Sequence, residues 1–583
     1  MRVKSKETSK HYLYVAILSV MLLLPNICAC LFANDLQQMG SRLVYSMVAV
    51  SLFLLPALVL RARAFFAIQS VLLFLALVEL SHLFMYNETS SILYVHTLLM
   101  SEWNEFVDMS VTLWPAILLY IIYIATYYFL WAKKILNIYL FNKKWRILLA
   151  IAFLVFFTGL LIPHLISYNP NKRWLPLEYA RAKQDDLLLR QKNVFPLNIY
   201  IALGNIISSN IIINREQNRL GDFSFGIDPK TDDDPETYVL IIGETARYGN
   251  FGINGYERNT TPYLSQIENL VSFDSIYSVA NLTAVSLPFM LTRATPQTPD
   301  ARYNEKSIVE AFAEAGFYTA WIANQSFGNH FLRRIAASCN YEFYEPHFIG
   351  DNTKYDMDLL SCAMPLLTDD AHPKKFIVLH SLGCHFKYNL RYPETFAQFQ
   401  PALEGNFNMR LMDKFHRPLI LNTYDNAILY TDFFIANTIE MLRSFGNKAV
   451  LFYVADHGEN LFDDNRNMIL HGTYAGSEYE YHVPVFIWTS DSYNQKYPQK
   501  VAALQTNGAK VKSTEAVFHS LLDMADIHYE KLDTTLSVWC RSLQSDSIIY
   551  GVDANWKLKV IHQCTDVRSN LLQNKTLKVK GLK

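Results

Sequence analysis

Five long apolar stretches occupy the first 168 residues, and they constrain the fold more than any other feature of the sequence. Each approaches or exceeds the ~20 residues that a helix needs to cross the hydrocarbon layer of a bilayer. They cover residues 12–33, 43–60, 64–85, 113–132 and 147–168. We therefore expect an α-helical transmembrane bundle of five spans over residues 1–168. The alternative is that one or two of these stretches are buried core helices.

Basic residues alternate between the segments that connect these stretches. The N-terminal tail and the loops around 61–63 and 133–146 contain Lys and Arg, whereas residues 86–112 contain neither. Lys and Arg are retained on the cytoplasmic side of a membrane. We therefore expect a multi-pass membrane protein with a cytoplasmic N-terminus, whose residues after the fifth span lie outside the cytoplasm.

The remaining residues have the composition and pattern of a globular domain. Residues 169–236 contain amphipathic stretches and end in a Pro- and Asp-rich turn, which predicts an interfacial or solvated linker. From residue 237 to 583, apolar runs alternate with helical patterns. Buried strands are predicted at 238–243, 318–323, 376–383, 449–455 and 483–489. This alternation predicts an α/β sandwich with a mostly parallel central sheet.

The charge balance excludes one class of partner. The chain has 52 Lys and Arg residues and 53 Asp and Glu residues, so its formal net charge is -1. Nucleic-acid binding requires a basic surface to neutralise phosphates. We therefore expect no nucleic-acid partner.

Polar residues with metal-binding groups follow two of the predicted strands. Glu244 closes the run 238–243, and Asp456 and His457 close the run 449–455. The carboxyl ends of parallel strands lie at one edge of a sheet, where ligands bind. Together with Thr283, these side chains would supply the oxygen and nitrogen donors that suit Zn²⁺, and Zn²⁺ would make the Thr hydroxyl a nucleophile at neutral pH.

Several motifs in the C-terminal region occur together. They are Ile242-Gly-Glu-Thr-Ala-Arg-Tyr-Gly249, Asn281-Leu-Thr-Ala-Val-Ser-Leu-Pro288, Leu379-His-Ser-Leu-Gly-Cys-His-Phe-Lys-Tyr388, Ala455-Asp-His-Gly-Glu459 and Leu470-His-Gly-Thr473. With five N-terminal spans, this set resembles the phosphoethanolamine transferases that modify bacterial lipopolysaccharide, within the alkaline phosphatase/sulfatase superfamily. The sequence around His385 is most similar to that of the family branch that modifies the lipopolysaccharide core.

The resemblance implies a role for each motif residue. It implies one Zn²⁺, with a second possible, bound by Glu244, Thr283, Asp456 and His457, with Thr283 as the nucleophile. His385 and His471 are the candidates for donors and acid catalysts, or for ligands of a second metal. Lys387 is a candidate for charge stabilisation nearby.

A second polar group lies after the third apolar stretch. Thr97, Ser101 and Glu105 are spaced four residues apart, which places them on one face of a helix. The family has a polar trio at this spacing that holds the headgroup of the donor lipid, although Thr97 replaces the usual Asn. The alternative is a solvated face of an interfacial helix.

The resemblance implies a monomeric transferase of the bacterial inner membrane, with residues 237–583 as its periplasmic catalytic domain. It would move phosphoethanolamine from phosphatidylethanolamine to lipid A phosphate or a core sugar, through a phosphothreonine at Thr283. The added ammonium would weaken the attraction of the cell surface for cationic peptides such as polymyxin. Two alternatives remain. One is a phosphoglycerol transferase of the lipoteichoic-acid-synthase type, and the other is a non-catalytic membrane-tethered sensor.

Overall fold

The computed structural model describes most of the chain in two compact units, residues 1–210 and 211–583. The described residues are 2–32, 36–86, 89–90, 95, 98, 114–167, 194–204, 220, 223–230, 234–325, 330–344, 355–405, 413–465, 468–472, 476–553 and 558–563. The boundary between the units lies within residues 169–236, and the role of this stretch as a linker stays a prediction.

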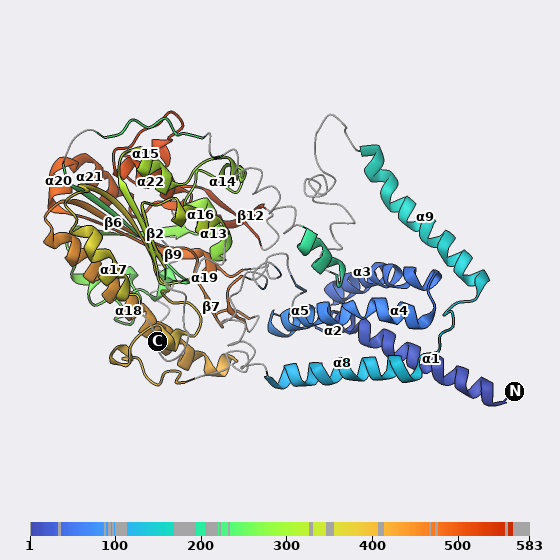
Figure 1. Ribbon diagram of the computed structural model, residues 1–583. Helices are drawn as coiled ribbons and strands as arrows, with labels where there is room; N and C mark the ends of the chain where they lie inside the picture. The colour runs from blue at the N-terminus through green and yellow to red at the C-terminus, as the bar shows by residue number, and fades with distance from the viewer. Residues whose placement is uncertain are drawn as a thin grey trace. The chain divides into compact units, whose positions relative to one another are not determined.

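The N-terminal unit is helical (Figure 1). Its helices are α1 (Arg2–Leu22), α2 (Leu24–Leu31), α3 (Leu36–Leu54), η1 (Leu55–Leu58), α4 (Ala62–Gln69), α5 (Val71–Tyr86), α8 (Trp114–Lys134) and α9 (Lys143–Ser167). Prolines at the starts of α2 and η1 interrupt longer helical runs, because proline lacks the amide hydrogen that a helix interior requires.

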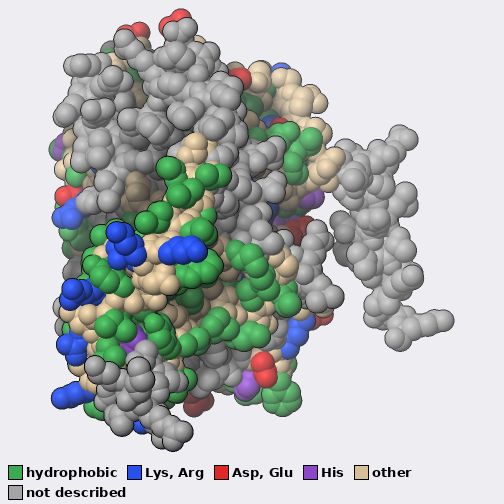
Figure 2. Space-filling view, turned by 90° about the vertical axis from the view of Figure 1, so that its right-hand side faces the viewer, with side chains coloured by type: hydrophobic (Ala, Val, Ile, Leu, Met, Phe, Trp, Pro, Cys, Tyr) green, Lys and Arg blue, Asp and Glu red, His purple; other side chains and the backbone are tan. Residues whose placement is uncertain are grey.

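This unit contains both buried and exposed large apolar side chains. A core surrounds Phe65, Phe66 and Tyr127, while Leu119 of α8 and Leu154 of α9 are more than 60% exposed. Figure 2 shows hydrophobic side chains spread over one face, with Lys and Arg among them. Outward-facing apolar residues of this kind are typical of helices that contact lipid.

Helices occupy each of the five predicted stretches, but the predicted count of five spans is not confirmed. Within the described residues, Ala62–Leu83 is long and apolar enough to cross a membrane. The pair Lys10–Leu22 and Leu24–Leu31, bent by 60°, is a second candidate if it counts as one span. Residues 99–112, most of the connection between the third and fourth predicted spans, and residue 113, the first of the fourth, lie outside the described residues.

An eight-stranded sheet forms the centre of the C-terminal unit, in the order β10-β2-β9-β6-β1-β5-β3-β4. The strands are β1 (Glu236–Gly243), β2 (Leu270–Tyr277), β3 (Tyr318–Ala323), β4 (Tyr341–Tyr344), β5 (Lys374–His380), β6 (Lys448–Ala455), β9 (His482–Thr489) and β10 (Val511–Ser513). All neighbouring strands are parallel except that β9 is antiparallel to both β2 and β6. The prediction of a mostly parallel sheet is therefore confirmed.

Helices cover both faces of this sheet, with α17 and α18 on one side and α15 and α22 on the other (Figure 1). The helices are α13 (Thr283–Met290), α14 (Ala301–Asn304), α15 (Ile308–Glu314), α16 (His330–Ala337), α17 (Asp358–Leu367), α18 (Arg417–Ser444), α19 (Glu478–Tyr481), α20 (Asp491–Lys496), α21 (Pro498–Asn507) and α22 (Ala516–Met524). Two small sheets pair β7 (Asn460–Leu461) with β8 (Ile469–Leu470), and β11 (Ile548–Val552) with β12 (Leu558–Gln563).

The centre of the sheet determines where the site can form. Strands β1, β5 and β6 are almost completely buried, because helices cover both faces. The pairing of β1 with β6 places Gly243 opposite Ala455. Glu244 and Asp456, which directly follow these two residues, therefore leave the same edge of the sheet side by side.

Candidate metal centre

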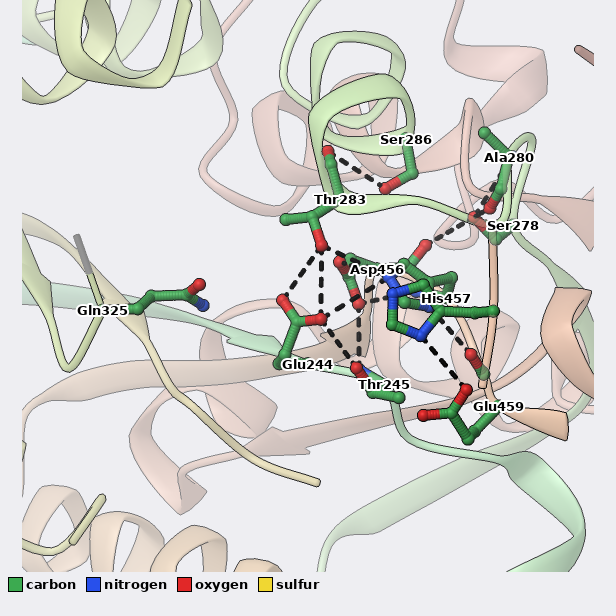
Figure 3. Close-up of polar contacts among 12 residues, drawn as sticks. Glu244, Thr245, Ser278, Ala280, Thr283, Ser286, Gln325, Asp456, His457 and Glu459 are labelled. Carbon is green, nitrogen blue, oxygen red and sulfur yellow. Dashed lines mark hydrogen bonds and ion pairs between the residues drawn. The ribbon is translucent and has the colours of Figure 1, made fainter. Parts of the chain in front are cut away.

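Thr283 is the first residue of α13, and the preceding Leu282 is extended. Its hydroxyl oxygen Oγ1 lies 3.2 Å and 3.1 Å from the two carboxylate oxygens of Glu244, and 3.2 Å from Nε2 of His457 (Figure 3). Residues 39 and 174 positions away in the sequence therefore meet at one hydroxyl group.

Two buried carboxylates face each other beside this hydroxyl. Ligand atoms of Glu244, Asp456 and His457 all lie within 4.8 Å of one another. Asp456 Oδ1 accepts hydrogen bonds from the backbone amides of Thr245 (3.1 Å) and His457 (2.7 Å). Its Oδ2 is buried, and among the described residues it accepts no hydrogen bond. Its nearest cationic group is the His457 ring, whose Nε2 lies 3.4 Å away. A buried anionic oxygen without a hydrogen-bond donor is an atom whose charge a bound cation would compensate.

The imidazole of His457 has a defined orientation. Its Nδ1 lies 2.8 Å from the carbonyl oxygen of Gly458, which can only accept a hydrogen bond. Nδ1 therefore carries the proton, and the lone pair of Nε2 points toward Thr283 and Glu244. This is the tautomer that a metal-binding histidine requires.

The electrostatics of the site agree with this geometry. Burial raises the pKa of Glu244, and the neighbouring Asp456 carboxylate raises it further. Burial alone would lower the pKa of His457, but the charges of Asp456 and Glu244 outweigh it and raise the pKa. Each shift is the response of a group that lies among uncompensated negative charges.

These residues fit Zn²⁺. Two carboxylates, one imidazole and one hydroxyl are oxygen and nitrogen donors that zinc accepts in a four-coordinate site. The four predicted ligands are brought together, and their coordination of zinc stays a prediction.

Two further histidines lie beside this group. The ring of His471 is 4.2 Å from that of His457 and 6.4 Å from that of His385, centroid to centroid. Burial lowers the pKa of His385 to about 4 and that of His471 well below its usual value. Both imidazoles are therefore uncharged at neutral pH.

Glu459 orients one of these histidines, and the sequence reasoning gave it no role. Its Oε1 lies 3.1 Å from Nδ1 of His471, and its Oε2 accepts a hydrogen bond of 3.0 Å from the hydroxyl of Tyr388. Burial raises the pKa of Glu459 to about 8. Its position three residues after Asp456 is the sequence feature that could have identified Glu459 as part of the site.

The loop that contains His385 is held by a buried carboxylate that the sequence reasoning also missed. Asp356 accepts hydrogen bonds from the backbone amides of Leu382 (2.8 Å) and Gly383 (2.9 Å). Gly383 has a φ of +48°, and an added Cβ would lie 2.8 Å from the carbonyl oxygen of Glu244. The loop can approach the Glu244 backbone so closely because position 383 is glycine.

The other predicted residues are less defined. Lys387 has a φ of +61° and precedes a 3₁₀ turn, two residues after His385; its contribution of charge stays a prediction. Thr97, Ser101 and Glu105 lie outside the described residues. Gln325, at the end of β3, lies on the other side of Glu244 from His457 (Figure 3), and no sequence signal pointed to it.

Comparisons with known proteins identify the family. The Sulfatase family matches residues 236–527, half of the chain. Phosphoethanolamine transferase EptC of Escherichia coli is 28% identical over 518 residues, 85% of each chain. The Kdo(2)-lipid A phosphoethanolamine 7''-transferase of Salmonella typhimurium is 36% identical over 274 residues, which cover 46% of each chain.

Solved structures agree in fold. The zinc complex of the C-terminal periplasmic domain of EptC from Escherichia coli covers 58% of this chain and 95% of that domain, with a TM-score of 0.52 and 25% identity. The integral membrane protein lipooligosaccharide phosphoethanolamine transferase A from Neisseria meningitidis covers 91% of this chain and 99% of its own, with a TM-score of 0.68 and 20% identity. The chain therefore belongs to the sulfatase family of enzymes, and its predicted resemblance to the phosphoethanolamine transferases is confirmed.

Proposed function

We propose that this enzyme transfers phosphoethanolamine from phosphatidylethanolamine to lipopolysaccharide, at a lipid A phosphate or a core sugar. One observation carries the proposal: the hydroxyl of Thr283 lies within 3.2 Å of both Glu244 and His457, in a buried site with an orphaned carboxylate oxygen. The names of its relatives support phosphoethanolamine as the group that is transferred.

Thr283 is the proposed nucleophile, with Glu244, Asp456, His457 and its own oxygen as the metal ligands. Zn²⁺ bound there would lower the pKa of the Thr283 hydroxyl, which is otherwise too weak an acid to attack phosphorus at neutral pH. Helix α13 fixes the backbone of Thr283, so its oxygen is held in position before the donor binds.

The reaction has two balanced steps. In the first, Thr283 Oγ1 loses its proton to solvent and forms a bond to phosphorus, the bond from phosphorus to the diacylglycerol oxygen breaks, and that oxygen takes up a proton from solvent. In the second, an acceptor oxygen loses its proton to solvent and forms a bond to the same phosphorus, the bond from phosphorus to Thr283 Oγ1 breaks, and Oγ1 regains a proton from solvent. The uncharged imidazoles of His385 and His471 are suited to donate hydrogen bonds to the phosphoryl oxygens.

The proposed setting is the inner membrane. Five spans over residues 1–168, a linker over 169–236 and a periplasmic catalytic domain over 237–583 would keep the enzyme, as a monomer, on the same surface as its lipid substrates. The fold shared over 91% of the chain with an integral membrane protein supports this. Thr97, Ser101, Glu105 and Lys387 are proposed to contact the donor headgroup. The added ammonium would reduce the binding of cationic peptides such as polymyxin.

The test compares lipopolysaccharide from cells that produce Thr283→Ala or Ser286→Ala. Ser286 is the matched control, because its hydroxyl lies one turn further along α13 and donates to the Thr283 carbonyl at 3.5 Å. Mass spectrometry should detect a phosphoethanolamine-sized addition with the wild-type and Ser286→Ala chains, but not with Thr283→Ala. An unchanged profile in Thr283→Ala would exclude Thr283 as the nucleophile.

The donor is tested with the purified full-length protein in vesicles of defined lipid. Transfer from phosphatidylethanolamine and none from phosphatidylglycerol is the expected result, and the reverse would indicate a phosphoglycerol transferase. Purified protein without zinc and without transfer from either lipid would instead favour a non-catalytic sensor.

A further inference from the structure

An exposed aromatic side chain lies at the same edge of the sheet as the metal ligands. Phe415 is 86% exposed, the highest fraction of any large hydrophobic side chain among the described residues. The backbone of Phe415 is positioned by Asp413, whose Oδ1 accepts a hydrogen bond from the Phe415 amide at 2.9 Å, within a short 3₁₀ turn (Lys414–His416).

A chain of ion pairs joins this turn to the metal centre. Arg417, two residues after Phe415, donates from Nη2 to Asp463 Oδ1 at 2.7 Å and from Nε to the carbonyl oxygen of Leu461 at 3.0 Å. Asp463 also accepts a 3.1 Å hydrogen bond from Arg247, which lies three residues after Glu244. The carboxylate of Asp463 is buried. Phe415 therefore has a fixed position relative to the loop that follows Asp456 and His457.

A second exposed aromatic residue adjoins the same ion pairs. Tyr479 is 43% exposed, and the guanidinium carbon of Arg247 lies 4.4 Å from the centre of its ring. A Cβ added to Gly458, the residue after His457, would lie 2.1 Å from the Tyr479 carbonyl oxygen. Phe415 and Tyr479 thus lie on two segments that border the metal-site loop. We call these two residues the aromatic rim.

The composition of the aromatic rim favours a lipid surface over a protein partner. Aromatic rings beside basic side chains are enriched where a membrane meets water. Lys414, which directly precedes Phe415, is exposed, and its cation is complementary to the phosphates of lipid headgroups.

We propose that Phe415 and Tyr479 insert into the headgroup layer of the membrane and hold the metal edge of the C-terminal unit against the bilayer. This inference rests on the proposed function, since a lipid donor and a lipid acceptor must reach Thr283 from that surface. A residue that docks the enzyme in this way takes no part in the chemistry.

The test uses photo-crosslinking in the full-length chain in membranes. The change Phe415→p-benzoylphenylalanine replaces one aromatic side chain by another. The control is Gln495→p-benzoylphenylalanine, because Gln495 is exposed and lines a hollow that includes Lys448, at the opposite, amino end of β6. Mass spectrometry should identify lipid-linked peptides from position 415, at about tenfold higher yield than from position 495.

Crosslinks from position 415 only to protein, or equal lipid yields at the two positions, would overturn the proposal. The readout does not depend on turnover, so it remains informative if Thr283→Ala leaves lipopolysaccharide unchanged. A second comparison uses Phe415→Ser and Phe415→Trp. At limiting donor in vesicles, the Ser variant should transfer about tenfold more slowly and the Trp variant at the wild-type rate. Equal rates for the two variants would contradict docking by this side chain.

Discussion

The two ends of strand β1 each place a buried glutamate in the C-terminal unit, and the two glutamates have opposite surroundings. Glu236 begins the strand and is 0% exposed, and Glu244 follows its last residue and is 1% exposed. Three lysine ammonium groups lie within 3.5 Å of Glu236, those of Lys230, Lys374 and Lys448. The nearest charged neighbours of Glu244 include a second carboxylate.

The pKa shifts of the two glutamates differ in sign for this reason. Burial alone would raise the pKa of Glu236, but the hydrogen bond from Tyr238 and the charges of Lys230 and Lys448 outweigh it and lower the pKa. Burial raises the pKa of Glu244, and Asp456 adds to the rise. A buried carboxylate whose charge the chain itself neutralises supports the fold. One that remains uncompensated needs a ligand from outside the chain.

The largest expected effect is a loss of activity when Glu244, the glutamate without a compensating cation, is changed. Glu244→Gln removes one charged ligand without changing the shape of the side chain, so we expect transfer to fall by about 10³-fold or more. The measurement is phosphoethanolamine transfer by the purified full-length protein. Asp369→Asn, an exposed carboxylate of the same unit, is the control and should retain the wild-type rate. Activity of Glu244→Gln within tenfold of wild type would contradict its role as a ligand.

The next largest effect is a loss of stability when Glu236, the glutamate surrounded by three lysines, is changed. Glu236→Gln leaves the buried lysine ammonium groups without a counter-charge, so we expect the free energy of unfolding to fall by about 3 to 5 kcal/mol. Denaturant titration of the C-terminal unit, followed by aromatic absorbance, would measure this loss. The double variant Glu236→Gln/Lys374→Met should recover part of it. A single variant as stable as wild type would show that the lysines do not depend on Glu236.

Removal of the metal should have a smaller effect on stability. A ligand present at 100 times its Kd stabilises the folded state by about 2.7 kcal/mol, so a chelator should lower the melting temperature of the wild-type protein by several degrees. Thermal unfolding with and without the chelator measures the shift. The chelator should change the melting temperature of Glu244→Gln only slightly, and it should lower that of Glu236→Gln by as much as that of the wild-type protein. The same shift in both variants would mean that the metal binds elsewhere.

The smallest expected effect is a change in acid sensitivity. The folded-state pKa of Glu236 lies below its ordinary value of 4.5, so its stabilising contribution is complete above pH 4.5 and is lost as the pH falls through the lowered pKa. We therefore expect Glu236→Gln to lose less stability than wild type on acidification below pH 4.5. Melting temperatures of both proteins, measured at pH values from about 3 to about 7 so that the series spans these pKa values, would test this. Parallel curves would contradict the assignment.

Local patterns in the sequence were enough to predict the central strands, although the run predicted at 376–383 extends three residues past the end of β5, and β2, β4 and β10 were not predicted. The apolar runs before Glu244 and Asp456 predicted β1 and β6 to within two residues at each end. The run at 318–323 matches β3 without a shift. These predictions succeed because a strand buried on both faces needs a continuous apolar run, which its own residues specify.

The sequence by itself therefore determined the central strands, the edge of the sheet where polar groups gather, and the residue types of the candidate metal centre. Only the tertiary structure decided that Thr283 begins a helix beside Glu244, that Nε2 of His457 faces it, and that Glu459 holds His471. The order β6-β1-β5 pairs Glu236 with Lys374 and with Lys448, which lie 138 and 212 positions away in the sequence, and a local pattern has no information on such pairings. The charge around Glu236 and Glu244 likewise depends on neighbours that only the folded chain supplies.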